Sequence, residues 1–89
     1  MASTYYAGFS VIPSERGYVA VARGTVAFRA DNPQQAGRER TTLVSSLEAK
    51  LPDELKGGRV IIKASHKNRS DVDTSQSPDV KDIGFYDLS

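Results

Sequence analysis

His66 is the only histidine of the chain and the first residue to consider for chemistry. A zinc or other transition-metal site needs several clustered ligands, and the chain has no cysteine to supply thiolates. Asp71 and Asp73 follow in the sequence, but they lie in a polar stretch without a regular pattern. We interpret His66 as a solvent-exposed residue at a strand end, and we expect neither a metal nor a cofactor.

Catalysis by a nucleophile or by paired carboxylates has little support. No serine lies on the glycine-flanked turn that exposes a nucleophile in hydrolases. The segment 24–29 lacks the further glycines of a phosphate-cradling loop. The remaining acidic candidates belong to the polar side of an expected helix and to the turn after it: Glu39, Glu48, Asp53 and Glu54. We predict no enzyme; the alternative left open is a metal-independent nuclease that uses arginine, lysine and His66.

Three segments have the composition and alternation of β-strands: residues 4–12, 18–30 and 59–66. The odd-numbered residues from Tyr5 to Val11 share one face of the first. In the third, Val60, Ile62 and Ala64 are expected to face inward and Ser65 outward. Pro13 to Gly17 reads as the hairpin loop between the first two.

The alternation of the second strand slips in its middle. Val19 and Val21 are odd-numbered, whereas Val26 and Phe28 are even-numbered. One extra residue at Arg23-Gly24 would bring all four apolar side chains to one face, and glycine is common in bulges. We therefore predict a β-bulge at this dipeptide.

A helix is expected from residue 33 to about residue 51. Asp31 or Asn32 is the predicted N-cap, and Pro33 suits the first helical position. Pro52 ends the helix. Apolar residues recur at helical spacing along it: Ala36, Leu43, Leu47 and Leu51.

The order β-β-α-β predicts an α+β fold, a small antiparallel sheet with one helix packed on one face and residues 82–88 as a candidate fourth strand. We place the domain at residues 1–66. Residues 67–81 are expected to be a polar linker or loop. Residues 82–89 are expected to be an acidic C-terminal tail or a short strand.

The formal net charge of +1 conceals an asymmetry along the chain of 89 residues. Residues 1–69 carry a net charge of +5, and residues 70–89 carry −4. No apolar run is long enough for a membrane span, and the first residues lack the basic and apolar regions of a secretory signal. We expect a cytoplasmic protein without a membrane partner.

The sheet face away from the helix is the strongest functional indication. It is expected to carry small residues, among them Ala20, Ala22 and Ala27, with cations at its border and no acidic residue. Such a face is suited to being covered. The residues predicted to bind a partner there are Tyr6, Tyr18, Arg29, Arg59, Ile61, Lys63 and Lys67.

The cover could come from the chain itself. Ile83 and Phe85 of the acidic tail could fold onto the small residues, with tail aspartates near Arg59, Lys63 and Lys67. Deletion of residues 70–89 would then destabilise the fold or cause self-association.

The cover could also be a partner. Our leading hypothesis is a non-catalytic protein that docks on a protein or ribonucleoprotein complex. In size and composition, without any shared motif, the chain is similar to accessory proteins of phages and mobile elements, including anti-CRISPR inhibitors. The alternative is a single-stranded nucleic-acid-binding module that uses the basic, tyrosine-bearing face. A homodimer is a further expectation left open.

Overall fold

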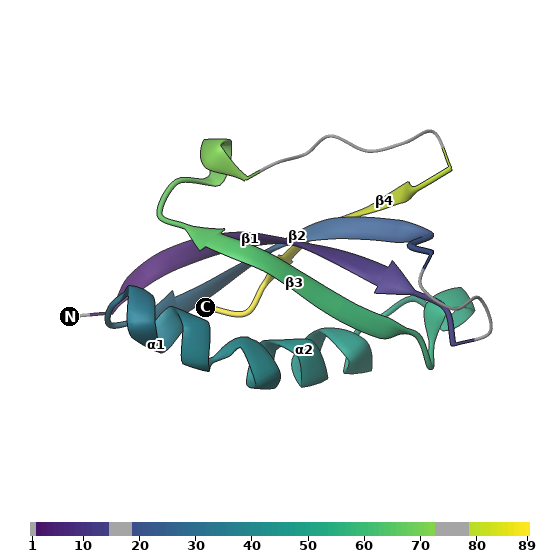
Figure 1. The fold of residues 1–89 in the computed structure, drawn as a ribbon, viewed down its shortest axis with the longest axis horizontal. Helices are drawn as coiled ribbons and strands as arrows, with labels where there is room; N and C mark the ends of the chain where they lie inside the picture. The colour runs from purple at the N-terminus through teal and green to yellow at the C-terminus, as the bar shows by residue number, and fades with distance from the viewer. Residues whose placement is uncertain (1, 15–18, 73–78) are drawn as a thin grey trace.

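The computed structural model describes residues 2–14, 19–72 and 79–89. A four-stranded sheet has the spatial order β3-β1-β2-β4. Its strands are β1 (Ser3–Ile12), β2 (Ala22–Ala30), β3 (Arg59–His66) and β4 (Lys81–Asp87). Figure 1 shows the two α-helices on one side of this sheet. The predicted α+β class is confirmed.

The strands differ in direction. β1 pairs antiparallel with both β2 and β3. β4 pairs with β2 in parallel, so the sheet is mixed rather than purely antiparallel as expected. The physical reason is that β3 and β4 run in the same direction at opposite edges of the sheet, an arrangement that a tight hairpin cannot produce.

The helical layer consists of α1 (Pro33–Arg38) and α2 (Arg40–Ala49), which replace the single helix expected to reach residue 51. Asn32 is the N-cap, and its side chain accepts a hydrogen bond from the Gln35 N–H at 2.8 Å. The break falls at Glu39, directly after Gly37 and Arg38. Helix propensity is low there because glycine loses much backbone freedom in a helix.

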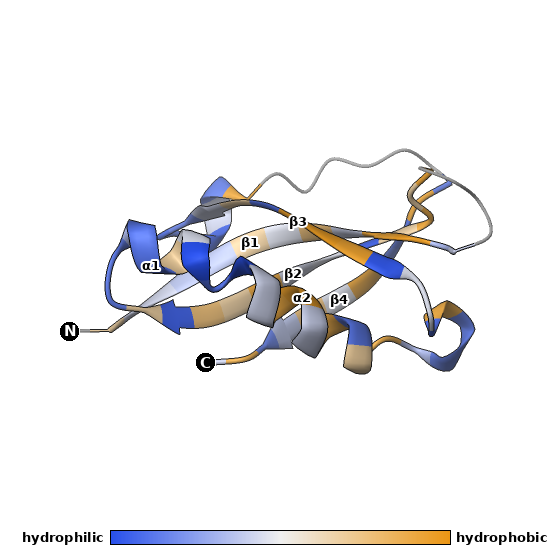
Figure 2. Cartoon of the chain, turned by 60° about the horizontal axis from the view of Figure 1, so that its bottom comes forward, coloured by the Kyte–Doolittle hydropathy of each residue, from blue (hydrophilic) through white to orange (hydrophobic). Residues whose placement is uncertain are grey.

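The core lies between the sheet and this helical layer. The odd-numbered residues of β1 face it, as the alternation predicts, and the fully buried side chains Phe9, Val11, Val26 and Leu47 form its centre. Figure 2 shows hydrophobic colouring concentrated in the strands, whereas α1 is largely hydrophilic.

The bulge predicted at Arg23-Gly24 is wrong. β1 and β2 pair without a register shift from Ser3 and Ala30 to Val11 and Ala22. The core side of β2 therefore carries the even-numbered residues, including Ala22, which was expected to face outward. Val19 precedes the strand and is 66% exposed, so it does not join Phe28 in the core.

Irregular pairing occurs in two other places. The β1–β3 register shifts between Ala7 and Phe9, which pairs Ser65 with the core residue Ala7 and reverses the outward orientation expected for Ser65. The β2–β4 register shifts between Arg23 and Thr25, where β4 contains Gly84 at φ 102°. A positive φ favours glycine, so the extra residue belongs to β4.

Candidate functional site

The outer side of the sheet, defined here as the side away from α1 and α2, is partly covered by residues 69–72, which follow β3. A short 3₁₀ turn, η2 (Arg69–Asp71), lies above this side in Figure 1. Val72 follows it and is 6% exposed. Gly8 and Ala27, two small residues of the outer side, are buried as well. The small-residue face is thus covered from within the chain.

Phe85 connects this cover to the sheet. Its ring lies 6.5 Å from the ring of Tyr6, centroid to centroid. The guanidinium of Arg69 lies over the Phe85 ring, 4.1 Å from its centroid. A cation over an aromatic face is attracted by the ring quadrupole. Tyr6, half-buried, is therefore packed against Phe85 rather than presented as an open stacking surface.

The tail does not fold across the basic face as one hypothesis expected. β4 instead extends the sheet beside β2, and Ile83, Tyr86 and Leu88 pack against the core. Its aspartate Asp82 pairs with Arg23, not with the predicted basic residues of β3. Phe85 alone reaches the outer side in the way that the tail hypothesis proposed.

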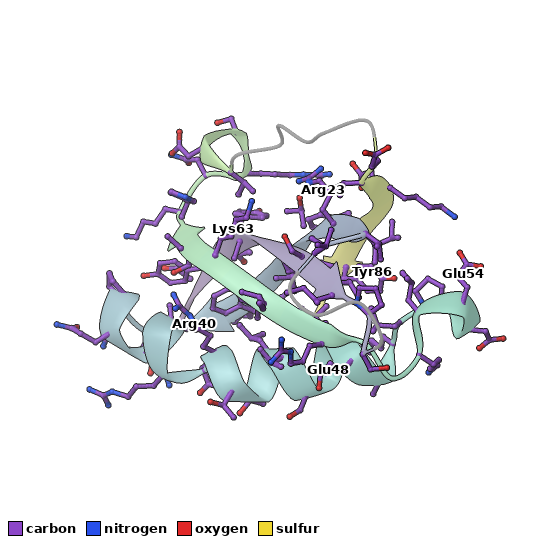
Figure 3. The ribbon with its side chains drawn as sticks, turned by 45° about the vertical axis from the view of Figure 1, so that its right-hand side comes forward. Arg23, Arg40, Glu48, Glu54, Lys63 and Tyr86 are labelled. Carbon is purple, nitrogen blue, oxygen red and sulfur yellow. The ribbon has the colours of Figure 1, made fainter. Side chains whose placement is uncertain are left out.

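Arg23 is the buried charge of this region. It lies on the outer side of β2 and is 6% exposed, and its Nη1 donates to Asp82 Oδ2 at 3.0 Å. Its Nη2 is buried and has no hydrogen-bond partner within the described part of the chain. A cavity of about 190 Å³ lies beside Arg23. Figure 3 shows Arg23 on the side of the sheet opposite the helices, close to β4. The cavity is lined by Arg23, Thr25, Arg69, Asp82, Gly84 and Phe85.

A second feature runs along the edge strand β3. We call Arg59, Ile61 and Lys63 of this strand, together with Lys67, which follows its end, the β3 strip. All four are exposed, and Ile61 is a large apolar side chain with 48% of its surface in solvent. Figure 3 shows Lys63 on the outer side of β3. The strand contains no acidic residue, so the strip combines one apolar side chain with cations.

Another predicted binding residue, Arg29, lies apart from this strip. Arg29 pairs with Thr4, and Arg59 pairs with Ile12, eight positions further along β1. At a rise of about 3.4 Å per residue, these arginines are separated by roughly 27 Å along the sheet. The Arg29 side chain instead donates to the Ala2 carbonyl at 3.1 Å. Tyr18 lies outside the described residues.

The groups considered for catalysis have separate surroundings. His66 is half-buried at the end of β3, opposite Tyr6. Glu48 Oε2 accepts a hydrogen bond from the Val60 N–H at 3.0 Å, so it is not merely solvated. Glu54 pairs with Lys81 at 3.2 Å on the surface. Across residues 2–14, 19–72 and 79–89, no three histidine or acidic side chains gather as a metal site would need.

The pKa of the Asp87 carboxyl is shifted. Hydrogen bonds from the Ser89 side chain and backbone N–H lower the pKa of Asp87 below its ordinary value. This carboxyl is exposed and lies at the end of β4.

Sequence reasoning missed Arg23 and Arg69 as binding candidates. Arg23 was assigned to a bulge, whereas its alternation with Val26 and Phe28 already places it on the outer side of a regular strand. Arg69 lies in a stretch whose composition indicates only a loop. The burial of Arg23 depends on Asp82, 59 residues away, and no local signal shows it.

None of the helices in the described segments is long and apolar enough to cross a membrane. Comparison with protein families, curated proteins and solved structures gave no match to this chain.

Proposed function

We propose that this protein is a non-catalytic binding protein whose β3 strip docks on an acidic surface of a protein partner. The observation that carries the proposal is Ile61, which is 48% exposed on the outer side of the edge strand β3 and is flanked by cations. Protein interfaces combine an apolar centre with a polar rim, and a few central side chains carry most of the binding energy. Ile61 has the position of such a centre.

The cations define the partner's chemistry. Lys63 and Lys67 lie on the C-terminal side of Ile61, and β3 supplies no carboxylate to neutralise them. Opposite charges across an interface speed association and select against wrong partners. A partner surface with an apolar pocket bordered by aspartate or glutamate would complement the strip.

Docking is expected through side chains rather than by addition of a strand. β3 is an edge strand, and edge strands can pair with an extended peptide. Here, however, the Val60 N–H, which lies beside Ile61 on this strand, already donates to Glu48 of α2. An incoming strand would have to displace that contact, whereas a side-chain interface would not.

The structure gives the nucleic-acid alternative less support. A single-stranded nucleic-acid platform needs open aromatic faces within a continuous basic surface. Tyr6 packs on Phe85, and Arg29 lies far from the β3 strip. Inhibition of a larger host complex, in the manner of phage or mobile-element accessory proteins, is the role that we propose for such a docking protein, because an 89-residue chain can act by covering a functional surface.

Site-specific photo-crosslinking tests the proposal. The photoreactive residue p-benzoylphenylalanine replaces Ile61 in one variant and Ser45, exposed on α2, in a control. Both are expressed in cells of the native host, and nuclease is added before analysis. We expect one protein to crosslink at position 61 and not at position 45. Equal crosslinking at both positions, or nuclease-sensitive adducts alone, would contradict docking through the strip.

A paired substitution gives a second readout. Ile61→Asp is expected to abolish recovery of the crosslinked partner, whereas Ser45→Asp is expected to retain it. The exposed position should limit the cost of Ile61→Asp to about 1 kcal/mol of unfolding free energy, so that lost recovery reports binding. Fluorescence anisotropy with a single-stranded oligonucleotide at low and high salt tests the alternative: salt-sensitive binding that Lys63→Glu abolishes would favour nucleic acid over protein.

A further inference from the structure

Arg23 is a buried guanidinium with only part of its hydrogen-bonding capacity used. Asp82 Oδ2 accepts from Nη1, while Nη2 has no partner among the described residues although the side chain is 7% exposed. Buried donors are normally paired, because an unpaired one loses its hydration without replacement. Arg23 therefore retains a donor, Nη2, that the pairing with Asp82 does not use.

A small cavity lies beside Arg23. The cavity of about 190 Å³ is lined on different sides by Arg23 and Thr25 of β2, Arg69 of η2, and residues of β4. Packing against Phe85 holds the Arg69 guanidinium at this wall, 4.1 Å from the ring centroid. Two arginines and a threonine thus line one small cavity.

We infer that this cavity binds a small oxyanion of the phosphate type between Arg23 and Arg69. The charges of the lining residues, two arginines against Asp82, favour an anion. Asp82 does not complete the site, because it is 52% exposed, and its other oxygen, Oδ1, accepts from the Gly84 N–H at 2.8 Å. Phosphate oxygens accept several hydrogen bonds at once, as the donors of Arg23, Thr25 and Arg69 require.

The inference is independent of the proposed function. The β3 strip lies at one edge of the sheet, whereas this cavity lies between β2 and β4 toward the other. Loss of protein docking would leave the oxyanion site intact, and the converse also holds. The ligand is defined by its chemistry, and it can be free phosphate or the phosphate group of a small monoester.

The test is an NMR titration of the full ¹⁵N-labelled chain with inorganic phosphate, with ionic strength held constant by chloride. We expect saturable shifts of the Arg23, Thr25 and Gly84 amide signals. Phenyl phosphate and acetate are titrated in parallel. Tighter binding of phenyl phosphate than of phosphate would assign the site to monoesters, and the reverse order would assign it to free phosphate. Equal affinity for acetate would overturn the phosphate assignment.

Three variants test the residues involved. Arg69→Ala, a substitution at an exposed residue, is expected to weaken phosphate binding about tenfold or more. Arg38 is an exposed arginine of α1, and Arg38→Ala should leave the affinity unchanged. Asp82→Asn removes the competing carboxylate and should strengthen phosphate binding several-fold. Shifts that never saturate, or equal affinity in Arg69→Ala and the native chain, would overturn the proposal. Weaker binding in Asp82→Asn would also count against it.

Discussion

The ring of Phe9 lies across Gly24, its antiparallel partner on β2. A Cβ atom at residue 24 would lie 2.5 Å from Phe9 Cζ and 2.8 Å from the Gly84 carbonyl oxygen. Phe9 is 1% exposed, and its ring also meets the Tyr86 ring edge-on at a centroid distance of 5.7 Å. Glycine at residue 24 therefore makes room for the aromatic contact that joins β1, β2 and β4.

Gly24→Ala is expected to lower the free energy of unfolding by about 1–3 kcal/mol, because the new methyl group overpacks a rigid site. Urea denaturation measures the change. Gly37→Ala is the matched control, since a Cβ there meets nothing within 4 Å. It should leave stability unchanged or raise it by up to about 1 kcal/mol through helix propensity. Equal stabilities of the two variants would refute the steric role of Gly24.

Glu48→Ala should cost about 1–2 kcal/mol, because it leaves the part-buried Val60 N–H without its acceptor. Glu48→Gln keeps an acceptor oxygen and should lower the free energy of unfolding less. Glu54→Ala is the control: its pairing with Lys81 is exposed, so a loss below about 1 kcal/mol is expected. Thermal or urea unfolding measures the stability of all three variants. If Glu54→Ala lost as much stability as Glu48→Ala, the hydrogen bond from the Val60 N–H to Glu48 would not be important for stability.

Tyr86→Ala should destabilise the protein by about 2 kcal/mol or more, since it removes the edge-to-face contact with Phe9 at the core. Phe85→Ala, on the same strand but 40% exposed on the outer side, should cost less. Urea unfolding measures the stabilities of the two variants. The opposite ranking would mean that β4 is held chiefly by its outer contacts.

Deletion of residues 70–89 removes β4 and uncovers the edge of β2. We expect a lower melting temperature together with self-association, because an unpaired strand edge can pair with another chain. Circular dichroism and size-exclusion chromatography measure these effects. A truncated protein with the same melting temperature and monomeric elution would show that β4 does not support the sheet.

Ser89→Ala should raise the pKa of Asp87 toward its ordinary value, since the Ser89 side chain is the largest cause of the lowering. The lowered pKa means that this carboxylate favours the folded chain above its ordinary pKa, and that the contribution disappears as the pH falls through the lowered value. An NMR titration of the Asp87 side chain measures the shift. Ser45→Ala should have no effect on it, and an identical Asp87 pKa in Ser89→Ala would exclude the hydrogen bond as the cause.

Local signals predicted several elements correctly. The alternation from Tyr5 to Val11 gives the buried face of β1, and Asn32 before Pro33 gives the start of α1. Both depend on residues next to one another in the chain. The bulge prediction failed because Val19 and Val21 were included in a strand that begins at Ala22. The even-numbered residues from Ala22 to Phe28 already form one regular face.

The candidate sites also contain residues that local signals identify and residues that only long-range contacts bring together. Ile61 and Lys63 were identified as exposed on the outer side because alternation along β3 is local up to its register shift. The separation of Arg29 from Arg59 could not be foreseen, since it depends on which ends of the strands are paired. The cavity at Arg23 needed η2 and β4 to be placed before it could be recognised.

The sequence alone determined the α+β class, the faces of β1 and the helix start, because periodicity and capping act over a few neighbouring residues. Only the tertiary structure decided that β4 joins β2 in parallel and that Asp82 and Phe85 reach Arg23 and Arg69. Such pairings join residues distant in the chain, and their stability comes from packing and charge in three dimensions, which no local pattern encodes.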